Sequence, residues 1–277
     1  MRQIGQRRTL MVLLIPGLIF IAVFFLAPLF YVLLESIRGE DGGGLTVAGY
    51  TDFFVDPISM RIYWRTLRIG ILVTVIATVL GYPASYLLSR MPVGRRTLLM
   101  SLVILPLMTN PVARTYAWLI ILGRFGLASK ALMWLGITDE PTRFLYSETA
   151  IILGLVQLFL PLMVLSLVSA LENISDEVVE AARSLGAGGF TTFARVIVPL
   201  SADGLVLGGT LVFTGAITAY VTPAILGGPR LLVLATLLQQ RALVAMDWTG
   251  ATVVAVVMLV TALIVNMALR RFRPEVA

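Results

Sequence analysis

The chain contains no cysteine and no histidine, and only 13% of its 277 residues are charged. It can therefore form no disulfide, no Cys/His zinc site and no Ser-His or Cys-His catalytic pair. The sequence has no glycine-rich phosphate loop ending in Lys-Ser or Lys-Thr, and no pair of acids inside its apolar runs. We expect a chain that is not itself an enzyme and binds no cofactor or metal.

Long hydrophobic runs dominate the sequence instead. Hydrophobic residues make up 58% of the chain, and its charged fraction is well below the roughly one quarter of soluble domains. An apolar run of about 20 residues can cross a bilayer core as a helix. Six such runs lie at residues 11–34, 69–89, 98–122, 149–171, 204–226 and 249–269. The sequence thus predicts an all-α integral membrane protein with six transmembrane helices in one domain, residues 1–277.

Basic residues indicate which connections lie in the cytoplasm. Six spans place both termini on one side, and the short turn 90–96 and both basic tails favour the cytoplasm for that side. The first run follows Arg2, Arg7 and Arg8, as in a signal peptide, but it is too long and no small-x-small cleavage site follows it. We expect a retained helix. The net charge of +6 fits this membrane bias and indicates no nucleic-acid partner.

The loop 172–200 is polar and has the pattern of two short helices. Ser175 is placed to cap the first helix through its hydroxyl, and Asp176 and Glu177 follow where the helix dipole favours acids. An apolar stripe recurs at helical spacing, in Val178, Ala181, Ala182 and Leu185. Gly186 stands where a left-handed residue would end the helix.

A second helix is predicted after the turn at Gly188-Gly189. Its apolar positions are Phe190, Phe193, Ala194 and Ile197, and Pro199 is expected to stop it. The product is a helix–turn–helix on the membrane face. The same pattern also fits an amphipathic interfacial hairpin that has no partner.

The order of residues in this loop resembles a known family pattern. Glu180-Ala181-Ala182 is followed three residues later by Gly186, and then by Ile197 and Pro199. This is similar to the EAA loop of the membrane subunits of binding-protein-dependent ABC importers, and it lies between the fourth and fifth predicted spans as in that family. The resemblance implies a type I permease fold in which this cytoplasmic loop docks on the ATP-hydrolysing subunit.

Two further segments resemble the spermidine/putrescine branch of these permeases. They are Pro106-Leu107-Met108-Thr109-Asn110 with Arg114-Thr115-Tyr116-Ala117-Trp118, and the stretch from Tyr220 to Pro229. The resemblance implies a polyamine such as spermidine or putrescine as solute. Related branches carry opines, aminophosphonates or iron, so these solutes stay open.

The resemblance also implies the partners. They are a dimer of ABC ATPases that bind ATP and Mg, a second permease subunit that is a different chain, and an external solute-binding protein. The expected location is the bacterial cytoplasmic membrane. ATP binding would drive the coupling loops and open the pathway outward, and hydrolysis would restore the inward-facing state.

Polar residues in the third span are the first candidates for the solute pathway. Arg114 is the only charge inside a predicted span, and Pro106 and Pro111 are expected to break the helix around Thr109-Asn110. The candidates are Thr109, Asn110, Arg114, Tyr116 and Trp118. Alternatively, Tyr116 and Trp118 belong to an interfacial aromatic belt, and Arg114 reaches the outer headgroups or pairs with a partner subunit.

The fifth span supplies a second set of candidates. Thr210, Thr214, Thr218 and Thr222 recur every four residues beside Tyr220, which predicts a hydroxyl stripe along one helix face. We take Thr214, Thr218, Tyr220 and Thr222 as pathway candidates. The alternative is that these hydroxyls bond back to their own helix or to a neighbouring helix.

Two other functions compete with the importer interpretation. An ion-driven secondary transporter would work without an ATPase, but the predicted spans contain no Asp or Glu to bind a proton or sodium ion. An intramembrane enzyme lacks the catalytic residue types. A polyamine is itself a cation, so the lack of acids also means that carboxylates must come from another subunit if the solute is a polyamine.

Overall fold

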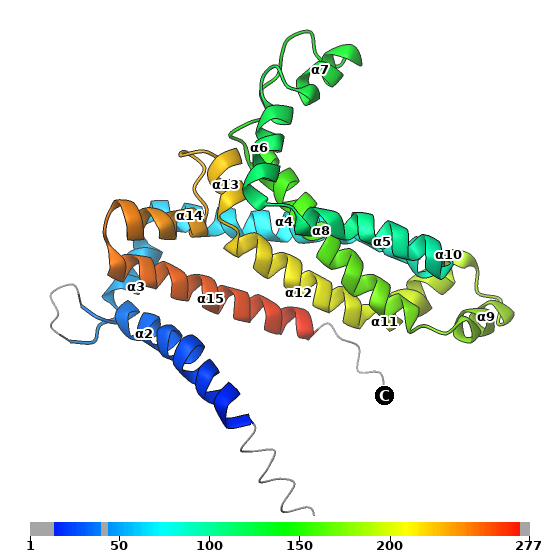
Figure 1. The fold of residues 1–277 in the computed structure, drawn as a ribbon, viewed down its shortest axis with the longest axis horizontal. Coiled ribbons are helices and arrows are strands. Elements are labelled where there is room, and N and C mark those ends of the chain that lie inside the picture. Colours follow the sequence, from blue (N-terminus) through cyan, green and yellow to red (C-terminus); the bar gives the residue numbers. More distant parts are fainter. Residues whose placement is uncertain (1–13, 40–43, 272–277) are drawn as a thin grey trace, which may run out of the picture. The chain divides into compact units, whose positions relative to one another are not determined.

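A computed structural model describes residues 14–39 and 44–271, and these residues form helices and connecting segments. The predicted all-α fold is confirmed, and residues 11–13 of the first predicted span lie outside the described part. The elements in chain order are η1 (Ala22–Leu26), α2 (Ala27–Ser36), α3 (Ala48–Val55), α4 (Pro57–Ser89), α5 (Val93–Met108), α6 (Pro111–Leu122), α7 (Leu127–Trp134), α8 (Glu148–Glu172), α9 (Asp176–Ser184), α10 (Gly189–Thr192), η2 (Phe193–Ile197), α11 (Val198–Leu200), α12 (Ala202–Thr218), α13 (Val221–Leu226), α14 (Leu234–Gln239), η3 (Gln240–Val244) and α15 (Trp248–Arg270) (Figure 1).

Five helical segments in the described residues are long and apolar enough to cross a membrane. They are Leu14–Ser36, Pro57–Ser89, Pro111–Trp134, Glu148–Glu172 and Trp248–Arg270. A sixth crossing is obtained if Gly189–Leu200 and Ala202–Thr218, which meet at a bend of 65°, are counted as one broken span. The described part therefore has five or six candidate spans, in line with the six predicted.

The chain divides into two compact units, of which the smaller holds the described residues up to Met60 and Leu238–Val257. In this unit Phe53 is buried, and the hydroxyls of Ser36 and Tyr50 lie 2.7 Å apart. Asp56 caps the start of α4 by accepting hydrogen bonds from the hydroxyl and amide of Ser59. These bonds hold the pKa of Asp56 below its usual range.

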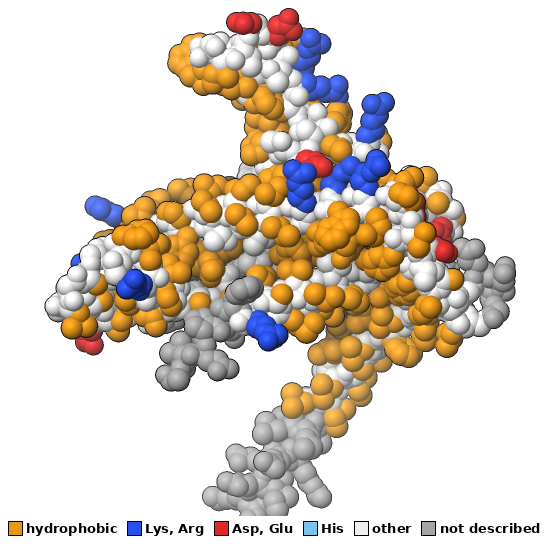
Figure 2. All heavy atoms as spheres, turned by 180° about the vertical axis from the view of Figure 1, so that it is seen from behind, with side chains coloured by type: hydrophobic (Ala, Val, Ile, Leu, Met, Phe, Trp, Pro, Cys, Tyr) orange, Lys and Arg blue, Asp and Glu red, His pale blue; other side chains and the backbone are white. Residues whose placement is uncertain are grey.

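The larger unit, Arg61–Leu237 together with Met258 and the described residues after it, is built around α8. Helix α12 packs along α8, and α5 and α13 also contact α8 (Figure 1). Leu155, Met163 and Leu167 of α8 are fully buried. Hydrophobic side chains cover much of the face shown in Figure 2, as expected for helices that lie in lipid.

Small residues let α12 approach α8 closely. Gly204 and Gly208 are four residues apart on α12, and a Cβ at Gly204 would lie 2.6 Å from the carbonyl oxygen of Ser166. A Cβ at Gly208 would lie 2.7 Å from the sulfur of Met163. In membranes, helix association depends on such close packing because lipid tails are as apolar as the side chains.

The second span is longer than the sequence predicted. Helix α4 begins at Pro57 rather than near residue 69, and α3 precedes it, so much of the connection between the first two predicted spans is helical. The prediction followed the uncharged run, but charges end a hydrophobic run without ending a helix. Arg65 and Arg68 lie within this extended part of α4, and both pair with the carboxylate of Glu148, at 3.3 and 3.7 Å.

The third and fifth predicted spans are each broken into two helices. The run 98–122 is interrupted between α5 and α6, where Thr109 and Asn110 are extended. The run 204–226 is interrupted at Ala219, which is extended between α12 and α13. A proline follows each break, Pro111 and Pro223, and proline has no N–H to continue the helical ladder. The first break was predicted, whereas treating 204–226 as one continuous helix was wrong.

Replacing Gly204 tests the contact between α8 and α12. Gly204→Ala should lower the stability by about 1–3 kcal/mol, because the added Cβ would lie 2.5 Å from the Cβ of Ala170. Gly209→Ala is the matched control, since its Cβ would approach no atom closer than 3.8 Å. Thermal unfolding in detergent should give a lower Tm for Gly204→Ala. A Tm equal to that of the control would contradict the tight contact.

Candidate functional site

Helix α9 forms the first half of the predicted loop 172–200. Asp176 and Glu177 occupy its first turn, as predicted. Negative charges at this position interact favourably with the positive end of the helix dipole. Ser175 stands at the N-cap position, but its hydroxyl makes no capping hydrogen bond. The predicted side-chain cap is therefore wrong. At this end the favourable contribution comes from the two acids in the first turn of α9.

The end of α9 is a tight turn centred on Gly186. The Gly186 amide donates to the Arg183 carbonyl at 2.9 Å, and the Ala187 amide donates to the Ala182 carbonyl at 3.1 Å. This pair of bonds is the Schellman pattern that satisfies the last carbonyls of a helix. Gly186 has a φ of +84°, in the region where a side chain is strained. The predicted left-handed end at Gly186 is thus present.

The two faces of α9 differ in what they contact. Val179 is buried against the chain, whereas Val178 is 42% exposed and Leu185 is 89% exposed. Glu180 and Ala181 are exposed as well, and Ala182 is half-buried. Phe190, in the second helical segment, is also largely exposed. Of the predicted apolar stripe, Val178, Ala181 and Leu185 are thus left uncovered by the described residues, and Ala182 is half-buried.

Ion pairs hold the loop against the turn between α4 and α5. Arg90 pairs with Asp176, and Arg96 pairs with Glu172 at 2.6 Å. Behind them, the rings of Tyr82 and Tyr86 contact the ring of Phe193 edge-on. The loop is therefore fixed to the bundle on its inner face while its outer face remains uncovered by the described residues.

The second helical segment runs further than predicted. It consists of α10, a π-helical turn η2 and α11, so Pro199 lies inside it rather than at its end. Because Pro199 cannot donate to the carbonyl four residues earlier, the wide turn just before it is a local adjustment to the missing bond. Ile197 is buried, and the segment ends at Ser201, whose hydroxyl lies 2.6 Å from that of Tyr82.

The break in the third span is closed by its own polar side chains. The hydroxyl of Thr109 and the guanidinium of Arg114 both donate to the Pro106 carbonyl, each at 2.7 Å. Asn110 accepts from the amides of Val112 and Ala113 and so caps α6. Arg114 Nη2 is buried without a hydrogen-bond partner in the described part of the protein. These three predicted pathway residues therefore also hold the break together.

The two breaks lie near each other. Helix α6 packs against α13, and the hydroxyls of Thr115 and Thr222 lie 3.4 Å apart. Each threonine is only a few residues beyond its break, so the ends of α5 and α12 approach the same region. Met108 at the end of α5 and Tyr220 at the start of α13 are both exposed there. Broken helices at membrane depth are tolerated where they are buried or line a cavity.

The remaining predicted pathway residues have different surroundings. Tyr116 is exposed, whereas the indole N–H of Trp118 donates to Gln157 of α8. Thr218 donates to the Thr214 carbonyl at 2.7 Å, and Thr214 lies 3.5 Å from Asn266. Thr222 is buried on α13, beyond the break. The predicted threonine stripe is therefore not one helix face, because the break removes Thr222 from it.

Sequence reasoning missed Asn266 and the two arginines of α4, Arg65 and Arg68, that pair with Glu148 at the start of α8. Asn266 is the one amide in the run 249–269, which is a signal that could have found it. Arg65 donates to the Leu232 carbonyl at 3.0 Å and pairs with Glu148. That pairing joins residues far apart in the sequence, and no local pattern indicates it.

Comparisons with known proteins agree with this geometry. Residues 77–277 match the family model "Binding-protein-dependent transport system inner membrane component". The chain is 34% identical over 238 residues to the spermidine/putrescine transport system permease protein PotB of Haemophilus influenzae, covering 84% of this chain and 83% of that protein. It is 34% identical over 203 residues to PotB of Escherichia coli, covering 73% and 74%.

A similar fold occurs in a solved structure of a bacterial ABC transporter that imports the acidic polysaccharide alginate. The TM-score is 0.79 at 17% sequence identity, and the match covers 99% of each chain. At this identity the likeness concerns the fold. A further solved structure of a bacterial alginate transporter, in complex with its periplasmic protein, gives the same TM-score of 0.79.

Replacing Gly186 tests the end of α9 without any transport assay. Gly186→Val should destabilise the turn by about 1–2 kcal/mol, because a side chain at positive φ is strained. Gly188→Ala is the matched control, since its φ is −66° and its added Cβ would meet nothing within 4 Å. Amide hydrogen exchange in α9 should accelerate in Gly186→Val alone. Equal exchange in both variants would show that the turn tolerates a side chain.

Proposed function

This chain belongs to the family of binding-protein-dependent transport system inner membrane components and is a permease subunit of an ABC importer. From this we propose that it moves a small solute inward, driven by ATP that a separate subunit hydrolyses. An external binding protein delivers the solute. The single observation that carries the coupling step is the apolar stripe of α9, which faces outward from a loop fixed to the bundle.

The outward face of α9 docks into a cleft of the ATPase. Leu185 and Val178 supply apolar contacts, and Glu180 adds a polar contact. The small side chains of Ala181 and Ala182 allow the helix to enter the cleft. Gly186 turns the chain sharply behind them, and Ile197 and Pro199 belong to the segment that fixes the loop to the bundle. ATP and Mg bind on the ATPase dimer, and its closure moves α9 together with the bundle.

Ion pairs support a cytoplasmic position for the loop and for both termini. Arg90 lies in the turn between α4 and α5, and Arg95 and Arg96 lie in the first turn of α5. Arg90 and Arg96 pair with acids of the loop. The loop 172–200 and the turn between α4 and α5 therefore lie at the same end of the bundle. Basic residues are concentrated on the cytoplasmic side of membrane proteins. This supports our proposal that the chain lies in the bacterial cytoplasmic membrane with both termini inside.

The solute passes the region of the two breaks, and a polyamine fits this region. The C-terminus of α12 ends there, and its partial negative charge favours a cation, whereas the Pro106 carbonyl near the end of α5 is already bound by Arg114. The exposed rings of Tyr116 and Tyr220 add faces that attract ammonium groups. The names of the PotB relatives point to the same solute class. Carboxylates come from the second permease, which is a different chain, and from the binding protein.

Coupling to the ATPase is tested by changing the exposed stripe. Leu185→Asp should lower co-purification of the ATPase with the permease about ten-fold or more, because it puts a charge into an apolar contact. Leu185→Met is the matched control, since it keeps an apolar side chain of similar size. Leu185 is 89% exposed, so neither change should alter folding of this chain. Full retention of the ATPase by Leu185→Asp would remove α9 from the docking surface.

Solute uptake tests the transport function itself. The permease is expressed with its neighbouring ATPase, second permease and binding-protein genes in cells that lack their own polyamine importer. Labelled spermidine and putrescine should enter, and uptake should stop when the ATPase is inactivated. ATPase-dependent uptake of an opine, aminophosphonate or iron complex would replace the polyamine assignment. Uptake that continues without the ATPase would indicate a secondary transporter.

A further inference from the structure

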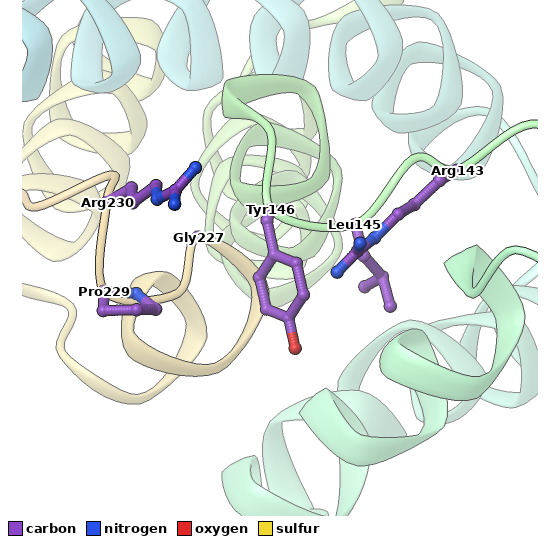
Figure 3. A pocket seen from close by; sticks show the side chains of 6 residues that line it. All are labelled: Arg143, Leu145, Tyr146, Gly227, Pro229 and Arg230. Atoms are coloured by element: carbon purple, nitrogen blue, oxygen red, sulfur yellow. The ribbon is translucent and has the colours of Figure 1, made fainter.

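A pocket of about 640 Å³ lies between the segment that leads into α8 and the loop between α13 and α14. Arg143 and Arg230 lie on opposite sides of Tyr146 in this pocket, with Gly227 and Pro229 beside them (Figure 3). The Arg143 guanidinium lies over the ring of Tyr146, 4.6 Å from its centroid. The pocket therefore presents two arginines around one aromatic ring.

The backbone around the pocket is held in a strained and well-fixed form. Tyr146 has a φ of +61°, and its amide donates to the Leu226 carbonyl at 2.8 Å. Gly228, at a φ of +66°, accommodates the Tyr146 ring, because a Cβ there would lie 2.6 Å from it. Strained residues of this kind persist only where the surroundings fix them, and they cluster at binding sites.

The loop that carries Arg230 is fixed on its other side as well. The Arg65 guanidinium donates to the Leu232 carbonyl, and the Leu234 amide donates to the Thr66 hydroxyl at 2.9 Å. Both bonds tie the loop to α4. The loop that carries Arg230 is thus held in place, which reduces the entropy lost when Arg230 binds a partner.

The charge around the pocket is strongly positive. Arg65 and Arg68 share the carboxylate of Glu148, whereas neither Arg143 nor Arg230 has an ion-pair partner among the described residues. Figure 2 shows several basic side chains gathered with an acidic one near the base of the projecting segment that carries α6 and α7. The two arginines that line the pocket, Arg143 and Arg230, make a site for an anion. A cationic solute would be repelled here.

The place of the pocket indicates the source of this anion. It lies before the first residue of α8, whereas the coupling loop follows the last residue of α8. A helix of 25 residues is about 37 Å long, so the two regions lie at opposite ends of the bundle. On the proposed orientation, the pocket opens on the side from which the binding protein arrives.

We propose that this pocket receives a carboxylate side chain from the surface of the external solute-binding protein, between Arg143 and Arg230. The guanidinium group suits this role because its planar set of donors matches the two oxygens of a carboxylate. The proposal rests on the proposed function, since it requires a binding-protein partner. It names the residues of this subunit that recognise that partner.

Binding of the purified binding protein to the assembled importer in nanodiscs tests the pocket. Arg143→Gln and Arg230→Gln should each raise the Kd about ten-fold, and the double variant should bind more weakly still and with less salt dependence. Arg124→Gln is the matched control: an arginine beside Phe125 that does not line the pocket. It should change the Kd less than two-fold. ATPase activity without binding protein should be the same in all variants, which shows that they are folded.

The outcomes separate the pocket from the function on which it rests. If the wild-type importer binds and responds to its binding protein but the double variant binds equally well, the pocket proposal is overturned. If the wild-type importer neither binds nor responds to it, the proposed function fails. Nanodiscs with and without phosphatidylglycerol distinguish a lipid phosphate as the anion. A loss of affinity that appears only with phosphatidylglycerol would assign the pocket to lipid and overturn the docking proposal.

Discussion

The Pro106 carbonyl shows the constraint on which the rest of this structure depends. In hydrocarbon no water is present to satisfy a backbone group, so a carbonyl released from a helix must find a partner within the protein. At the break between α5 and α6 the Thr109 hydroxyl and the Arg114 guanidinium meet this need. The single charge in the span therefore repairs the backbone. A lysine at this position would offer a compact ammonium group in place of the planar guanidinium and its fixed set of donors.

The loop 172–200, for which we propose the coupling role, meets a related requirement. A short helix is marginal by itself and gains stability from the face that it buries. Here α9 buries Val179, pairs Asp176 with Arg90 and ends in a hydrogen-bonded turn, so it needs no partner to keep its shape. Its exposed stripe is then free for docking. A motion imposed on such a loop passes to α4 and α8 through the ion pairs and the aromatic contact at Phe193 rather than being lost in a flexible connection.

Local features of this fold could be predicted from the sequence, and contacts between distant residues could not. The apolar runs gave the spans because burial in lipid requires long uncharged stretches. Gly186 and the pair Pro106 and Pro111 gave a turn and a break because glycine and proline act on the backbone where they stand. The stop at Pro199 was wrong, since contacts of Tyr82 with Phe193 and Ser201 hold the segment on both sides of the proline. The structure gives no reason for the missing cap at Ser175. The break at Ala219 was missed because hydrophobicity continues across it. Arg65 and Glu148, 83 positions apart, show no common local pattern.

The distribution of charge is compatible with the cationic solute and the orientation that we propose for this basic subunit. Arginines at the outer pocket and at the cytoplasmic turn lie at the two ends of α8, whereas the two breaks present helix C-termini and aromatic rings. The positive charge of Arg143 and Arg230 at the outer pocket repels a cation. The same charge attracts an acidic protein surface. At the breaks, Arg114 is turned onto the Pro106 carbonyl, and part of its charge is therefore offset by that dipole. The subunit can then recognise its protein partner by charge and leave selection of the solute to the binding protein and to the second permease.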